Sequence, residues 1–146
     1  MKRSTGLRNF MLSSGSLKQA LDGKVIKIYS GPAPISADAA LSGDNVLLAT
    51  VSVNGTGAGI TMTAAAENGT LAKNSSEVWS GEVATNGTAS FFRMETAADD
   101  GSLSMTAVRI QGSIALDGAD MNFATLTLIS GNTRQINYFV ISVSAG

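Results

Sequence analysis

Two short acidic segments hold the residues best suited to chemistry in this sequence. Asp99 and Asp100 are adjacent in AADDGS, and Asp117 and Asp120 lie three positions apart in LDGAD. Two carboxylates flanking a cleft could hydrolyse a glycosidic bond, and carboxylates converging in a loop could bind calcium. Each pair, however, has a neighbouring glycine, as in turns where Asp accepts a hydrogen bond from nearby backbone, and EF-hand spacing is absent. We therefore interpret both segments as turns.

Other catalytic arrangements lack the residues that they require. The sequence contains neither histidine nor cysteine, which excludes disulfides, zinc–thiolate sites and the commonest general base. Neither a G-x-S-x-G nor an S-x-x-K motif is present to activate a serine. The glycine-rich stretch 55–59 precedes the strand-like GITMTA, whereas a phosphate-binding loop precedes a helix. We predict a protein that is not an enzyme and that uses no cofactor and no metal ion.

The tripeptide Asn-Gly-Thr occurs three times, at Asn54, Asn68 and Asn86. It matches the N-glycosylation pattern, but Asn-Gly is also a strong signal for a tight β-turn. The opening MKRSTGLRNFML has no apolar stretch long enough for a secretory signal, and no run of 18 apolar residues follows. We therefore expect no export and no membrane, and we interpret the tripeptides as turns. Asn86, between two clear strands, fits a hairpin best, and Asn68 fits least.

Runs of β-branched, aromatic and alternating residues predict seven to nine short strands. The clearest runs are 24–30, 46–53, 59–64, 77–84, 89–96, 105–115, 121–129 and 134–144. Only SLKQALDG, with Ser16 as N-cap and Gly23 as terminator, favours one or two turns of helix. This pattern is typical of an all-β, antiparallel β-sandwich, either jelly-roll or immunoglobulin-like. The residues predicted for its core are Ile26, Ile28, Trp79, Phe91, Phe123, Tyr138 and Phe139.

The first 15 residues predict an extended basic arm ahead of a single sandwich domain at 16–146. Six of the ten Lys and Arg residues and one acidic residue lie in the first 27 positions, a net charge of +5. The alternative is an ordinary solvated terminus. An arm with an apolar knob fits an acidic protein surface, whereas nucleic acid would require a basic face with interleaved aromatic residues. The residues predicted to contact the partner are Lys2, Arg3, Arg8, Phe10, Met11 and Leu12.

Three segments, taken in order, carry a family resemblance. They are SLKQALDGKVIKIYSGPAPISADAALSGDNVLLATVSVNG, EVWSGEVATNGTASFFRMETAADDGS and VRIQGSIALDGADMNFATLTLISGNTRQINYFVIS. Over about residues 16–144 the chain resembles a family of small structural proteins from tailed bacteriophages and prophages. The resemblance implies a β-sandwich component of the virion, on the outside of the head or in the neck and tail. It implies no catalytic residues.

The resemblance and the arm together lead us to expect a capsid decoration, or cement, protein. Such a protein would form oligomers, with a trimer favoured, and would bind the major capsid protein or neighbouring virion proteins through its arm. The alternatives are a neck or tail structural protein and, from another class, a carbohydrate-binding module on the virion surface. A single Trp and two Tyr argue against that module. We expect the protein to be made in the bacterial host cytoplasm and to end in the virion, where the capsid surface is the favoured location.

Overall fold

The computed structural model describes residues 1–143, which form twelve strands and two short helices. The helices are α1 (Thr5–Ser13) and α2 (Leu17–Leu21). The strands are β1 (Lys2–Arg3), β2 (Val25–Tyr29), β3 (Leu47–Val53), β4 (Thr70–Ala72), β5 (Trp79–Glu82), β6 (Gly87–Thr88), β7 (Phe91–Glu95), β8 (Ile110–Ala115), β9 (Met121–Asn122), β10 (Thr127–Leu128), β11 (Thr133–Ile136) and β12 (Val140–Ser142). The predicted all-β, sandwich-like fold is confirmed, with more and shorter strands than expected and one more helix.

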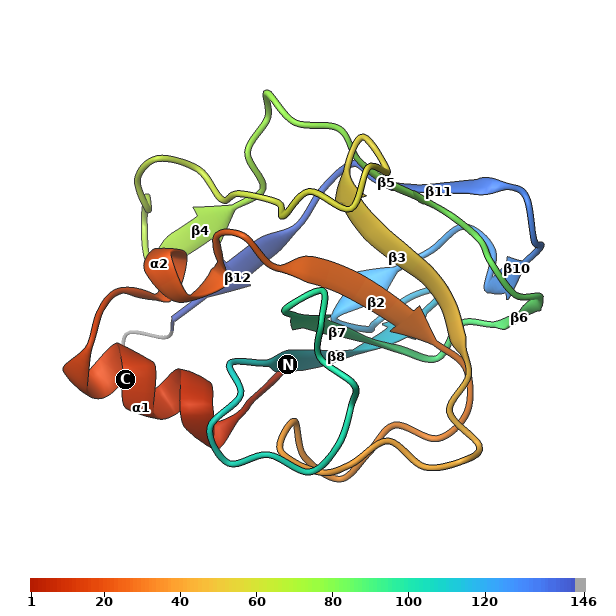
Figure 1. The fold of residues 1–146 in the computed structure, drawn as a ribbon. Coiled ribbons are helices and arrows are strands. Elements are labelled where there is room, and N and C mark those ends of the chain that lie inside the picture. Colours follow the sequence, from red (N-terminus) through yellow and green to blue (C-terminus); the bar gives the residue numbers. More distant parts are fainter. Residues whose placement is uncertain (144–146) are drawn as a thin grey trace.

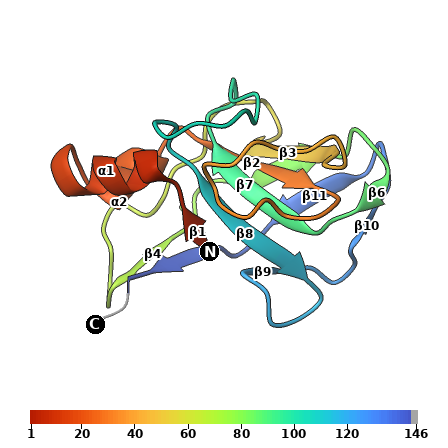
Figure 2. The same ribbon diagram turned by 90° about the horizontal axis from the view of Figure 1, so that it is seen from below.

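One large sheet organises the molecule, with the order β1-β8-β7-β2-β3-β5-β11. All of these neighbours are antiparallel, and β9 adds a short parallel pairing at the end of β8. Two small sheets, β10-β6 and β12-β4, complete the fold (Figure 1). The two helices lie at one end of the strands, and β6 and β10 lie at the opposite end (Figure 2). No helix among the described residues is long and apolar enough to cross a membrane.

The central strands β2 and β7 are buried along their whole length, because both of their faces are covered. One face carries the apolar side chains of Ile26 and Ile28 opposite Met94 and Phe92. On the other face, Lys27 lies opposite Arg93. Successive side chains of a strand point to opposite faces, so the charged residues of β2 and β7 all lie in one layer, together with Val25, Tyr29 and Phe91.

Six of the seven residues predicted for the core are buried: Ile26, Ile28, Trp79, Phe91, Phe123 and Phe139. The prediction is wrong for Tyr138, whose side chain is 78% exposed. Phe139 packs against Trp79 and Phe92, with ring centroids 5.9 Å away in both cases. Because neighbouring residues in an extended segment point in opposite directions, burial of Phe139 leaves Tyr138 in solvent.

The prediction of an extended arm over residues 1–15 is wrong. β1 pairs with β8, and α1 begins immediately afterwards. Ser4 is the N-cap of α1, where its hydroxyl accepts the Leu7 N–H at 3.1 Å. The same hydroxyl donates to the Ala107 carbonyl and accepts the Arg109 N–H. Ser4 and Leu7 are fully buried, so this N-terminal unit is an ordered part of the sandwich.

Gly6 allows α1 to pack closely against the rest of the fold. Glycine disfavours helix interiors, but a Cβ at this position would overlap the carbonyl oxygens of Thr106 and Ala107. The close approach of α1 to the loop before β8 therefore requires glycine. By contrast, α2 lies where the sequence placed it, since Ser16 and Gln19 form a capping box.

The turn predictions hold at two of the three Asn-Gly-Thr sites. Asn54 and Asn68 have positive φ, as do the glycines that follow them. At Asn68, Glu67 and Thr70 exchange two backbone hydrogen bonds of 2.9 Å, which makes this site a two-residue hairpin. Asn86 and Gly87 have negative φ, so the prediction there is wrong. Gly87 begins β6 instead, and a Cβ on it would overlap the Leu48 side chain.

Three of the predicted strands are interrupted. The run 59–64 forms only isolated bridges, at Ile60 with Lys24 and at Met62 with Lys73. The run 121–129 divides into β9 and β10, and the run 134–144 divides into β11 and β12. Ser144, the last residue of that run, lies outside the described residues, as does the end of the predicted domain 16–146.

Candidate functional site

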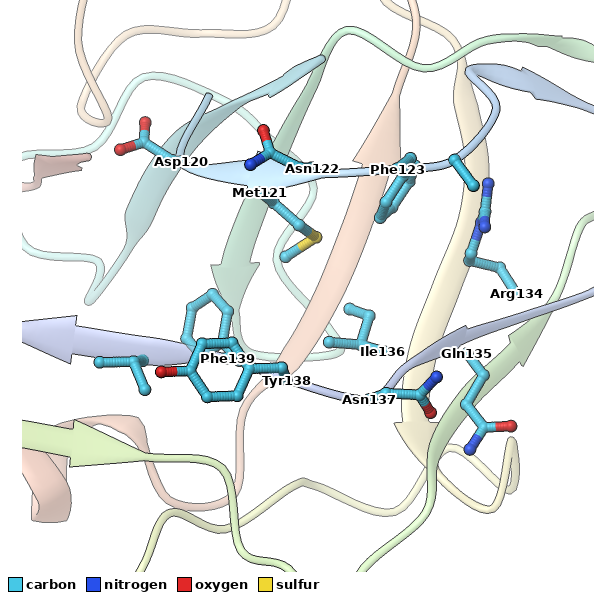
Figure 3. A pocket seen from close by; sticks show the side chains of 12 residues that line it. Asp120, Met121, Asn122, Phe123, Arg134, Gln135, Ile136, Asn137, Tyr138 and Phe139 are labelled. Carbon is cyan, nitrogen blue, oxygen red and sulfur yellow. The ribbon is translucent and has the colours of Figure 1, made fainter. Parts of the chain in front are cut away.

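A groove opens between two segments that are not paired with each other, 120–124 and 134–140. Its volume is about 470 Å³, within the range of sites that hold small ligands. The two segments run in opposite directions across the groove (Figure 3). The first contains β9, and the second contains the end of β11 and the beginning of β12.

The floor of the groove is apolar and its rim is polar. Four buried side chains form the floor: Met121, Phe123, Ile136 and Phe139. Exposed residues lie next to them along the chain, among them Asn122, Gln135, Asn137 and Tyr138. Figure 3 shows Met121 and Phe123 pointing from one wall towards Ile136 and Phe139 on the other. Buried and exposed residues alternate at 121–123 and at 135–136, as on strands with one inner face, whereas two exposed residues separate Ile136 from Phe139.

Strand β11 pairs with β5 along one edge, and its other edge faces the groove. Val83 donates its N–H to the Asn132 carbonyl at 2.8 Å, and the register then pairs Arg134 with Gly81 and Ile136 with Trp79. In an antiparallel ladder, residues alternate between facing the partner strand and facing away from it. Arg134 and Ile136 therefore direct their N–H and C=O groups towards β5, and Gln135 directs its groups towards the groove.

The backbone of β9 has the same arrangement on the opposite wall. Phe123 donates its N–H to the Ala115 carbonyl at 2.9 Å, in the parallel pairing with β8. Because alternate residues of a strand face opposite neighbours, Asn122 directs its N–H and C=O away from β8 and towards the groove. Both walls thus present unpaired backbone groups to one space.

Arg134 lies at one end of the groove. Its guanidinium lies 4.1 Å from the centroid of the Phe123 ring and donates to the Thr125 carbonyl at 2.8 Å. Burial lowers the pKa of Arg134 from its ordinary value. No acidic side chain among residues 1–143 forms an ion pair with it. This end therefore carries a positive charge that can accept an anion.

Asp120 lies at the other end of the groove, and its carboxylate is already hydrogen-bonded within the protein. Its carboxylate accepts hydrogen bonds from the N–H and hydroxyl of Ser113 and from the amino group of Met1, the last at 2.7 Å. Burial would raise the pKa of Asp120, but these hydrogen bonds outweigh it and lower the pKa.

The residues predicted to contact a partner are only partly brought together. Arg3, Arg8, Met11 and Leu12 line a surface hollow of about 540 Å³ together with Met1. Lys2 lies elsewhere, where it donates to the Ile35 carbonyl at 3.0 Å. Phe10 is half-buried against the core and is not part of the hollow. We call these five lining residues the N-terminal hollow.

Both acidic segments form turns, and Asp99 in the first of them also binds Arg109. Asp100 and Asp117 accept hydrogen bonds from the backbone N–H of Ser102 and Gly118. Asp99 accepts the Gly101 N–H and also holds Arg109 through two bonds of 2.6 and 2.7 Å. Within residues 1–143, no cluster of three or more acidic side chains could hold a metal ion.

Sequence reasoning missed a buried polar layer on the second face of the central sheet. Its members are Lys27, Tyr29, Arg93, Glu95, Arg109 and Gln111. Alternating charged and apolar residues in VIKIY and FFRME are the pattern of a strand with one solvated face. That face is instead covered by the loop 30–46, whose carbonyls at Pro34 and Ala39 accept bonds of 2.7 Å from Gln111 and Arg93.

The electrostatics of this layer follow from its burial. Burial raises the pKa of Glu95, while Lys27 lies 3.1 Å from its carboxylate. Burial and the neighbouring Glu95 also raise the pKa of the Tyr29 hydroxyl. The polar layer is enclosed by protein, so its bonds position the covering loops rather than a ligand.

No family model, no curated protein and no solved structure matches the chain.

Proposed function

We propose that this chain is a non-enzymatic structural protein of a tailed-bacteriophage virion, and specifically a decoration protein that binds the assembled capsid. The family resemblance over residues 16–144 and the sandwich-like body support this proposal. The observation that carries it is the N-terminal hollow, an apolar surface with basic flanks that is held by the paired strand β1 and the capped helix α1.

The chemistry of the hollow specifies its partner. Leu12 is 85% exposed, and Arg3 and Arg8 flank it. Neither arginine forms an ion pair among residues 1–143. An apolar contact surrounded by uncompensated positive charge complements an apolar patch with an acidic rim. We assign that patch to the major capsid protein or a neighbouring virion protein.

Binding to the assembled shell would stabilise it by mass action. A protein that binds the closed shell, and not its dissociated subunits, lowers the free energy of the shell with every copy bound. A homo-oligomer, with a trimer favoured, would bind several shell subunits at once and gain avidity.

Point substitutions test this proposal better than deletion of residues 1–15, which would remove the buried Ser4 and Leu7. Purified heads that lack the protein are mixed with the recombinant chain, and bound copies are measured by sedimentation. Leu12→Asp and Arg8→Glu should each reduce occupancy by about tenfold or more, as expected for a central apolar anchor and a rim charge. The matched control is Ile129→Asp, next to β10 at the far end of the molecule, which should bind normally. Unchanged occupancy of both hollow variants would refute the docking surface.

Copy number separates the decoration role from the neck or tail alternative. A decoration protein is present in hundreds of copies per particle, whereas a neck ring holds about a dozen or fewer by symmetry. Quantitative mass spectrometry of purified virions measures this number directly.

One observation favours carbohydrate binding as a second candidate function. Tyr138 exposes its ring beside the groove, and exposed aromatic rings are common platforms for sugars. A glycan array probed with the native protein and with Tyr138→Ala tests this candidate, and only binding that Tyr138→Ala loses would support it.

A further inference from the structure

We propose that the groove between 120–124 and 134–140 binds one extended peptide strand of a partner protein, which pairs with both walls and bridges the two edges of the large sheet. The peptide carries apolar residues at alternate positions and a carboxylate at the end next to Arg134. This inference goes beyond the virion role and does not depend on it.

The unpaired backbone of the walls is the first argument. Asn122 and Gln135 direct their N–H and C=O groups into the same groove from opposite sides, as derived from the β8–β9 and β5–β11 pairings. Exposed strand edges are usually blocked by lysine, proline or a covering element. The exposed residues here are neutral, Asn122, Gln135, Asn137 and Tyr138, so they leave the edges open to pairing. Addition of a strand to such an edge is a common mode of peptide recognition.

The floor supplies the second argument. Met121, Phe123, Ile136 and Phe139 lie beneath the space that an inserted strand would fill (Figure 3). A strand in this position points every second side chain at the floor, and apolar side chains there would leave water for an apolar surface. The remaining side chains would point to solvent beside Gln135 and Asn137.

Arg134 supplies the third argument, because its positive charge indicates that the partner carries a negative one. Its guanidinium is held in place by the Phe123 ring and the Thr125 carbonyl, and it has no acidic partner in residues 1–143. A partly buried guanidinium favours a carboxylate, through charge-assisted hydrogen bonds. A Glu or Asp side chain, or a free carboxyl end, meets this requirement.

A peptide library tests the proposal. Fluorescent seven-residue peptides alternate Val, Ile or Leu with Thr or Ser and carry Glu at one end or the other. Binding to the native chain is measured by fluorescence anisotropy, and amide hydrogen exchange is measured for the bound protein. We expect micromolar binding by the best members, with new protection at the amides of Asn122 and Gln135. Replacing the peptide Glu with Lys should weaken binding about tenfold, as should N-methylation of alternate peptide amides, since each removes hydrogen bonds.

Two variants of one residue separate backbone pairing from side-chain contact. Gln135→Ala keeps the N–H that faces the groove, so it should weaken binding far less than a substitution that removes this N–H. Gln135→Pro removes that N–H and leaves the bonds of Arg134 and Ile136 to β5, so it should weaken binding about tenfold. Arg134→Gln should abolish the preference for Glu over Lys in the peptide.

Several outcomes would overturn the proposal. One is that no library member binds with a dissociation constant below about 1 mM. A second is that N-methylated and parent peptides bind equally well. A third is that a peptide binds without protecting the amides of Asn122 and Gln135 from exchange. Binding of an oligosaccharide in the groove in place of every peptide would also overturn it. If Gln135→Pro fails to fold, the N-methylated peptides and the exchange data on the native chain decide the question without it.

Discussion

The two faces of the central strands β2 and β7 are equally buried and chemically different. On the apolar face, Ile28 lies opposite Phe92, and Met94 lies between Ile26 and Ile110. On the polar face, Arg93 lies between Lys27 and Gln111 in the same register. The apolar face contributes through the area that it removes from water, whereas the polar face depends on having a partner for each charge.

The polar face meets that requirement with backbone as well as side chains. Lys27 donates to the Asp99 carbonyl at 2.6 Å and pairs with Glu95, and Arg109 is held by Asp99. Two buried side-chain polar atoms among the described residues lack a hydrogen bond, Nη1 of Arg93 and Oε2 of Glu95, and the latter lies 3.8 Å from Arg109. The comparison teaches that the apolar face contributes stability by burial, whereas the polar face fixes the positions of loop 30–46 and of the connection 96–109 through hydrogen bonds.

The largest effect should come from the apolar face. Phe92→Ala removes a fully buried ring that packs edge-on against Phe139, and it should lower the free energy of unfolding by about 4 kcal/mol. Urea denaturation measures the change. Leu12→Ala, at an exposed position, should change it by less than about 0.5 kcal/mol. A similar value for both variants would contradict the assignment of Phe92 to the core.

Breaking one ion pair should have the next largest effect. Lys27→Met leaves the Glu95 carboxylate buried without its nearest cation and should cost about 3 kcal/mol. Adding Glu95→Leu removes the unpaired charge, so the double variant should be more stable than Lys27→Met alone. Denaturation of the two single variants and the double variant gives the coupling. Additive losses would mean that the two residues do not act as a pair.

A smaller effect should appear in the pH dependence of stability, where Glu95 and Asp99 of the polar face should act in opposite directions. Burial raises the pKa of Glu95 above 4.5, so the folded chain takes up this proton first and gains stability as pH falls towards 4.5. Burial opposes ionisation of Asp99, but hydrogen bonds from Arg109 and Gly101 lower its pKa below 3.8. The unfolded chain therefore takes up that proton first, and stability falls below pH 3.8.

Urea denaturation of the native chain, Glu95→Gln and Asp99→Asn across this range checks both signs. Glu95→Gln should lack the gain, and Asp99→Asn should lack part of the acid loss. Curves that stay parallel for all three proteins would show that neither carboxyl titrates differently on unfolding.

The smallest effect should come from Tyr29→Phe. The substitution keeps the ring stacked on Phe91, at a centroid distance of 5.1 Å, and removes the hydroxyl that donates to Glu95 at 3.3 Å. We expect a loss of about 1 kcal/mol or less, the value of one such hydrogen bond. A loss as large as that of Phe92→Ala would mean that the two faces do not differ as described.

The strands that sequence reasoning located best are those whose pattern is local. VIKIY and FFRME lie where their β-branched and aromatic residues predicted, and the cap at Ser16 was readable from its spacing to Gln19. Burial of Lys27, Arg93 and Glu95 could not be read in this way, because it depends on a loop that folds over them. The hairpin prediction at Asn86 was wrong for a related reason. Glycine is needed at position 87 because its backbone packs against the side chain of the distant Leu48, and not because the chain turns there.

The groove was beyond sequence reasoning altogether. The runs around β9 and β11 were predicted as strands, but their free edges arise only from the order of strands in the sheet. The pair of buried and exposed aromatics, Phe139 and Tyr138, was the nearest local signal. Strict alternation predicts that only one of two adjacent rings can lie in the core.

The cap on α1 has a consequence for how the chain is made. Ser4 bonds to Ala107 and Arg109, and β1 pairs with Ile110 and Gln111, so Lys2, Arg3 and Ser4 cannot take their places until the chain has been synthesised past Gln111. Contacts between such distant positions form late and slowly. The N-terminal hollow is thus assembled only after β8 has been synthesised. A chain that ends before β8 would not present it to a partner.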